Sequence, residues 1–173
     1  MDIILYGSLH GSARRYAERL SEMTGIGAVS FDAAKNIIDY ARVIYIGAIY
    51  AGCIRGLKKT VSHMTDTQQL FVASVGVADP TDEENVRNIR TFLRGTVPAP
   101  LYDDARVFHL LGAIDYSRLS LVHRLLLSML KSKASKMPEE ELNAESRAIL
   151  STYGGKHDFV DFSCLEPIAA ALR

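Results

Sequence analysis

The chain has 173 residues, of which 48% are hydrophobic and 23% are charged. This size and apolar content fit one compact domain with a sizeable core and exclude an intrinsically disordered chain. Twenty basic and twenty acidic residues give a net charge of zero, which argues against a basic nucleic-acid-binding protein and against a strongly acidic carrier.

The cysteines and the apolar runs indicate where in the cell the protein is located. Cys53 and Cys164 are too far apart in sequence for a metal-ligand motif, so we expect reduced thiols and no metal site. Asp2 precedes a first apolar run, residues 3–6, that is too short for a signal peptide. No run reaches the ~20 apolar residues that span a bilayer. These features predict a cytoplasmic protein, with a location peripheral to the membrane left open.

Short apolar runs alternate with amphipathic stretches along the chain. The runs are continuous, as in strands that are buried on both faces of a parallel sheet. Amphipathic spacing predicts a helix over 13–23, a shorter one over 55–63, and one that starts with a capping box at Thr81. This alternation predicts a single α/β domain over residues 1–173, with right-handed crossovers. The predicted strands cover residues 3–6, 28–31, 43–46, 70–73 and 107–111.

One long segment, residues 112–137, interrupts this alternation before a helix start at residues 138–141. It exceeds an ordinary loop, which predicts a functional insertion or an interface. Residues 115–136 hold five basic residues and one acidic residue, a net charge of +4. One helical face carries Leu119, Val122, Leu126, Met129 and Leu130. We favour packing of this face in the core or in a homodimer; contact with an anionic membrane surface through 117–133 is the alternative.

The first strand run is followed by a short polar loop and then at once by a helix. Glycines let the backbone curl, and N–H groups at a helix N-terminus attract oxyanions, so the loop is a candidate phosphate cradle. An ordinary turn with Ser12 as the N-cap is the alternative. The loop residues are Ser8, Leu9, His10, Gly11, Ser12 and Ala13.

Residues 5–17 resemble the phosphate loop of flavodoxins, which bind flavin mononucleotide (FMN). His10 and Ala13 stand where that family has hydroxyl residues, so two hydroxyl donors are missing. The resemblance implies a three-layer sandwich with a parallel sheet in the order 2-1-3-4-5. It also implies two flavin-ring loops, the first made by Ala48, Ile49, Tyr50, Ala51 and Gly52 and the second by Ser74, Val75, Gly76, Val77 and Ala78.

The downstream part, residues 111–120 and 158–168, is similar to the flavodoxin-like protoporphyrinogen oxidase (dehydrogenase) group. That resemblance implies an FMN-dependent oxidoreductase that passes electrons from a reduced organic substrate to a quinone or another acceptor. No residue stands out as a catalytic nucleophile or base, which fits a reaction whose electron transfer belongs to the cofactor. A flavodoxin-type electron carrier and a flavin-free interaction module are the alternatives.

Overall fold

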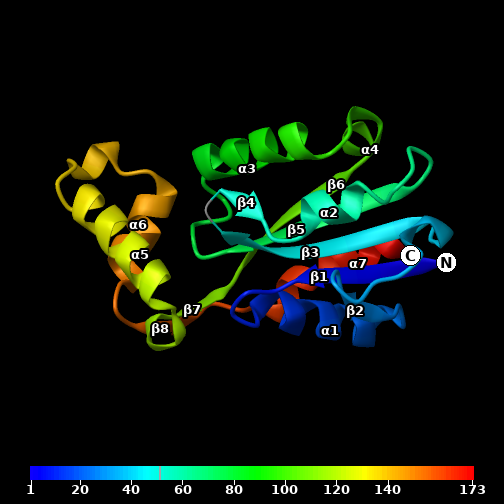
Figure 1. Cartoon of the computed structure of the whole chain (residues 1–173), viewed down its shortest axis with the longest axis horizontal. Coiled ribbons are helices and arrows are strands. Elements are labelled where there is room, and N and C mark those ends of the chain that lie inside the picture. Colours follow the sequence, from blue (N-terminus) through cyan, green and yellow to red (C-terminus); the bar gives the residue numbers. More distant parts are fainter. Residues whose placement is uncertain (51) are drawn as a thin grey trace.

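The computed structural model describes residues 1–50 and 52–173 and is built around a parallel sheet (Figure 1). Five strands lie in the order β2-β1-β3-β5-β6, the 2-1-3-4-5 order that the resemblance implied. Their register places Ile4 beside Ile44 and Ile44 beside Phe71, so the apolar runs form continuous buried rows. The strands are β1 (Asp2–Gly7), β2 (Ala28–Ser30), β3 (Arg42–Tyr50), β5 (Gln69–Gly76) and β6 (Arg106–Leu111).

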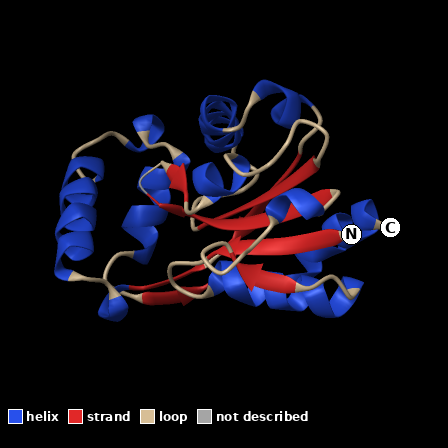
Figure 2. Cartoon of the chain, turned by 45° about the vertical axis from the view of Figure 1, so that its right-hand side comes forward, coloured by secondary structure: helices blue, strands red, loops and turns tan. Residues whose placement is uncertain are grey.

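Helices cover both faces of this sheet, as the three-layer prediction requires (Figure 2). One face packs against α1 (Ser12–Thr24) and α7 (Glu166–Leu172) through Tyr16, Leu20 and Ile168. The opposite face packs against α2 (Leu57–Val61), α3 (Glu83–Thr96) and α4 (Ala99–Asp103). Successive strand residues alternate between these two cores, so both faces of each central strand are apolar.

Local backbone features set the helix starts differently from the sequence predictions. Asp82, rather than Thr81, caps α3, because its carboxylate accepts the Asn85 N–H at 2.9 Å. Thr81 donates instead to Asp79 through its backbone and its hydroxyl. Helix α2 is shorter than 55–63 because Gly56, with φ 79°, immediately precedes it.

The carboxyl end of β3 forms a small hairpin that the sequence analysis treated as a loop. β3 continues to Tyr50, and β4 (Cys53–Ile54) pairs antiparallel with it. A Cβ at Gly47 would lie 2.2 Å from a methyl carbon of Ile54, so the hairpin folds tightly over its own strand.

After β6 the chain leaves the sheet for residues 113–158, which we call the excursion. It contains β7 (Ala113–Asp115), α5 (Leu121–Ala134), α6 (Ala144–Thr152) and β8 (Lys156–Asp158), and β7 pairs antiparallel with β8. It therefore extends well past the predicted limit at 137. The expected helix start at 138–141 is wrong: Glu139–Glu141 is a single 3₁₀ turn, and α6 begins after Asn143, whose side chain accepts the Ser146 N–H.

Within the described part of the chain, no helix is both long enough and apolar enough to cross a membrane. The same residues contain no cluster of three or more histidine, cysteine or acidic side chains that could hold a metal ion.

Candidate functional site

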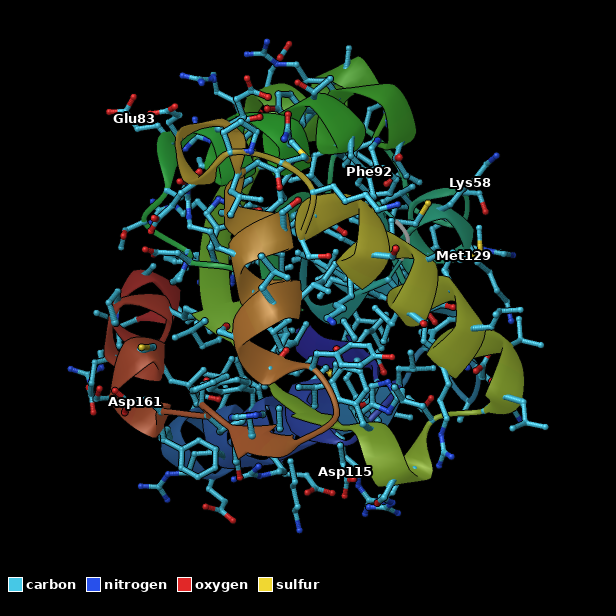
Figure 3. All side chains as sticks on the ribbon, turned by 90° about the vertical axis from the view of Figure 1, so that its left-hand side faces the viewer. Lys58, Glu83, Phe92, Asp115, Met129 and Asp161 are labelled. Atoms are coloured by element: carbon cyan, nitrogen blue, oxygen red, sulfur yellow. The ribbon has the colours of Figure 1, made fainter. Side chains whose placement is uncertain are left out.

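The carboxyl ends of β1, β3, β5 and β6 open into one pocket of about 270 Å³. This is the edge at which ligands bind in open parallel sheets. The pocket takes residues from all three predicted loops, and its far side is closed by the excursion (Figure 3). The predicted residues that line it are Leu9, His10, Ser12, Ala48, Ile49, Tyr50, Gly52, Val75, Gly76, Val77 and Ala78.

The loop before α1 has the geometry of an anion cradle. Gly11 has φ 96°, a left-handed conformation that glycine adopts without strain, and its N–H donates to the Ser8 hydroxyl at 3.0 Å. The first backbone bond of α1 runs from the Arg15 N–H to the Gly11 carbonyl. The N–H groups of Ser12, Ala13 and Arg14 precede that bond, so no partner within the helix takes them. They are available to an oxyanion at this end of the helix.

The side chains of Ser12 and Ala13 turn inward. Ser12 is the first residue of α1, with Gly11 as the cap, so the alternative that made Ser12 the N-cap is wrong. The Ser12 hydroxyl accepts the Ala113 N–H at 2.8 Å and thus ties the loop to the start of the excursion. Ala13 is fully buried in the core beneath the loop. A phosphate would therefore meet the backbone of Ala13 rather than its side chain.

The β3–β4 hairpin brings an aromatic side chain to the pocket. Tyr50 is 36% exposed, and its ring lies 4.7 Å from the His123 ring of α5, at 59°. A planar ligand on Tyr50 would therefore lie beside His123. Ala51, which the prediction included, lies outside the described residues.

The end of β5 and the loop after it supply residues to the pocket wall. Val75 and Gly76 end the strand, Val77 and Ala78 follow it, and all four line the pocket. A Cβ at Gly76 would lie 3.3 Å from a side-chain carbon of Ile49. Ser74 differs: it is 1% exposed, is absent from the lining, and its hydroxyl lies 2.8 Å from Nδ1 of His109. Ser74 therefore supports the strand beneath the loop.

His10 of the cradle loop lies near two side chains of the excursion, His123 and Arg118. Partial burial lowers the pKa of His10 below its usual 6.5, and the nearby His123 and Arg118 lower it further, while Asp115 opposes them. His10 is therefore mostly neutral near pH 7. A bound anion would favour the protonated form of His10 and would raise its pKa.

The excursion builds a pocket wall whose residues were not among the predicted site residues, although the insertion at 112–137 was expected to be part of the substrate-facing or membrane-facing surface. Tyr116, Leu119 and Thr152 line the pocket together with residues of α5 and α6. Tyr116 is 7% exposed, and its hydroxyl has no hydrogen-bond partner among the described residues. The sequence did contain a signal for this wall, because three residues of the predicted apolar helical face, Leu119, Leu126 and Leu130, line the pocket. The other wall residues from the excursion are Ala113, Ile114, His123, Leu127, Asn143, Ala144, Glu145, Ala148 and Ile149.

Comparisons with known proteins identify the family of the chain. A family model that describes the flavodoxin domain matches residues 3–141 of the chain. The chain belongs to the flavodoxin domain family. A search of curated proteins finds no match. Among solved structures, this flavodoxin domain is similar to the Trp repressor binding protein of Bacillus subtilis, with 16% identity, a TM-score of 0.45, and coverage of 65% of this chain and 83% of that one. It is also similar to a flavodoxin from the domain Archaea, with 15% identity, a TM-score of 0.38, and coverage of 62% and 82%.

Membership of this family implies a flavin cofactor, and the site can be tested against that expectation. The open backbone at Gly11, where an added Cβ would meet nothing within 4 Å, leaves room for a phosphate beside the free N–H groups of α1. Small residues at and after the end of β5 and the aromatic ring of Tyr50 at the end of β3 flank the pocket. In this flavodoxin domain the donor set and the pocket fit a flavin phosphate and ring.

Proposed function

We propose that this flavodoxin domain binds FMN at the carboxyl edge of its sheet and acts as an FMN-dependent oxidoreductase. The observation that carries the proposal is the convergence of three sheet-end loops on one pocket, with a fourth wall supplied by the excursion. Bound FMN would supply two-electron transfer from a reduced organic substrate to a quinone or another acceptor.

The residues of the chain would hold the cofactor at two ends. The cradle from Ser8 to Ala13 would take the phosphate through the N–H groups of α1, with the Ser8 hydroxyl at its edge. The hairpin at Tyr50 and the loop from Val75 to Ala78 would flank the ring. Ser74 and Ala51 were predicted for the same site; Ser74 would act only by supporting its strand.

The excursion wall is the part of the pocket suited to an organic substrate. Leu126, Leu127 and Leu130 from α5 face Ala148 and Ile149 from α6 across the apolar lining. The unpartnered Tyr116 hydroxyl could orient one polar group of a substrate there. A mainly apolar wall with a few polar side chains, among them Asn143, Glu145 and Thr152, is compatible with an organic substrate, and protoporphyrinogen is the candidate from the sequence resemblance.

Mutation of Ser8 tests the cofactor site. In Ser8→Asp, a negative charge at the edge of the cradle should repel the phosphate by on the order of 1–4 kcal/mol and weaken FMN binding roughly tenfold or more. Fluorescence titration of the purified chain with FMN measures the dissociation constant. Ser8→Asn is the matched control, because its amide is similar in size, can accept the Gly11 N–H and adds no charge. Equal FMN affinity in wild type and Ser8→Asp would mean that the phosphate binds elsewhere.

An anaerobic assay tests the substrate. The FMN-loaded protein is mixed with protoporphyrinogen IX and menaquinone, and we expect loss of flavin absorbance on substrate addition and recovery on quinone addition. No turnover, with FMN still bound, removes that substrate while leaving the cofactor site intact.

A flavodoxin-type electron carrier is the second candidate, because the family includes proteins of that kind. Separate one-electron steps in a redox titration, with no reduction by any organic substrate, would favour it. A chain that binds no added FMN would leave only the flavin-free interaction module.

A further inference from the structure

Helix α5 presents a row of large apolar side chains to solvent. Leu121 is 82% exposed, Val122 74%, and Leu125 and Met129 64% each. Figure 3 shows Met129 projecting from the outer side of α5, away from α6. We call these four residues the α5 outer face. Such a cluster is unusual on a soluble surface, where large apolar side chains are normally scattered singly.

The α5 outer face takes no part in packing α5 against the rest of the described chain. The opposite side of α5 carries Leu126, Leu127 and Leu130, which line the pocket, and the helix packs on α6 rather than on the sheet. The predicted single apolar arc is therefore two arcs: Leu126 and Leu130 turn toward the pocket, and Val122 and Met129 turn outward. A helix that is apolar on both sides is typical of one covered on both sides.

Exposed cationic side chains flank the α5 outer face at both ends of the helix. Arg118 precedes α5, Lys133 follows Met129 by four residues and so lies on the same side of the helix, and Lys136 follows the helix end at Ala134. The remaining two cations are engaged inward: Arg124 donates to the carbonyls of Tyr116 and Ser117, and Lys131 lies over the Tyr153 ring. No acidic residue occurs from 116 to 138.

We propose that the α5 outer face docks this protein on an anionic membrane surface. An amphipathic segment with large apolar residues and flanking lysines and arginines lies in the headgroup region, where apolar burial and attraction to anionic lipids add. Charge complementarity distinguishes lipid from a second copy of the chain. Two α5 helices packed face to face would bring Arg118, Lys133 and Lys136 of one copy near the same cations of the other, whereas anionic headgroups neutralise them.

The proposal does not depend on the proposed function, since none of the four outer-face residues lines the pocket. It has one consequence for that function. Because α5 separates the outer face from the pocket, docking would place the pocket wall next to the lipid phase, where a quinone resides.

Vesicle co-sedimentation of the full chain tests the proposal. Vesicles of phosphatidylcholine with phosphatidylglycerol should bind the wild type, and pure phosphatidylcholine vesicles should bind it much less. Binding should weaken as salt increases, because the electrostatic part is screened. No binding to the anionic vesicles would overturn the proposal.

Two double variants separate the apolar from the electrostatic contribution. Val122→Ser with Met129→Ser should weaken binding at least about tenfold, because each buried side chain contributes roughly 1.5–3 kcal/mol. Lys133→Gln with Lys136→Gln should weaken binding to anionic vesicles by roughly tenfold or more, at about 1 kcal/mol per lysine, and should leave binding to phosphatidylcholine unchanged.

Ile38→Ser is the control variant, because Ile38 is 61% exposed and lies outside the excursion. Circular dichroism checks that all variants fold. Unchanged vesicle binding in the serine variant would overturn the proposal. So would a lipid-free dimer in size-exclusion chromatography that the serine substitutions dissociate, because the face would then be covered by a second copy.

Discussion

The sheet layer and the excursion bury their apolar residues differently. In the sheet layer, Leu5, Leu20, Ile44 and Leu93 are fully buried, and each strand lies between two helical layers. In the excursion, two helices pack on each other and on the pocket, and α5 keeps four large apolar side chains in solvent. From this contrast we expect stability to reside mainly in the sheet layer, and the excursion to supply the surfaces that we propose for a substrate and for a membrane.

Truncation of a buried leucine tests the contrast most strongly. Leu20→Ala should lower the free energy of unfolding by roughly 2–5 kcal/mol, because it removes apolar contacts and leaves a cavity between α1 and the sheet. Leu125→Ala on the α5 outer face should change it by no more than about 0.5 kcal/mol. Urea denaturation followed by circular dichroism measures both. Equal losses would mean that the excursion contributes to the core as much as the sheet layer does.

The junction between the two regions should show an intermediate effect. Ser12→Ala removes the acceptor of the Ala113 N–H, and leaving such a group unpaired costs about 1–3 kcal/mol. Ser132→Ala, on the exposed side of α5, is the matched control and should have little effect. Faster hydrogen exchange of the Ala113 amide in Ser12→Ala would localise the change to the junction, and an unchanged exchange rate would contradict it.

A partly buried histidine of the sheet layer, His109, should make stability depend on pH. Burial, and secondarily Arg90, lowers the pKa of His109 below its usual 6.5. As pH falls below about 6.5, the unfolded chain therefore takes up this proton before the folded chain does. The free energy of unfolding should fall until the lowered pKa is reached, by at most about 1.4 kcal/mol per pH unit for one proton.

His109→Gln should reduce this slope in denaturation curves recorded at several pH values. His63→Gln is the control, because His63 is exposed. The pKa of His10 is also lowered, so part of the slope should persist in His109→Gln. If the slope of the free energy of unfolding against pH is undiminished in His109→Gln, the pKa of His109 does not differ between the folded and the unfolded chain.

The sequence predicted the sheet layer better than the excursion, for physical reasons. Runs such as 43–46 are continuous because both faces are buried, and this pattern is readable without a structure. The short strands β4 and β7 have two and three residues, which are too few to show the two-residue alternation of a strand. The start of α6 was readable in principle, since Asn143 is a common N-cap residue.

The candidate site was predicted where it depends on strand ends and missed where it depends on tertiary packing. The cradle at Gly11 follows β1 and Tyr50 ends β3, so their meeting at one edge follows from parallel topology. Tyr116 and Thr152 reach the same pocket only because the excursion folds back over it. Nothing in their local sequence carries that information.

The excursion leaves and rejoins the sheet layer at neighbouring residues. The Gly112 N–H donates to the Gly76 carbonyl at 2.6 Å, and the Phe159 N–H donates to the Gly112 carbonyl at 3.1 Å. The ends of the whole segment are therefore already joined by a hydrogen bond, with Ala113 paired to Asp158 just beyond it. Insertions, deletions or exchanges beyond this narrow stem would reshape the pocket wall and the outer face without changing the path of any strand in the sheet. The stem is the natural point at which to graft a different excursion onto the same domain.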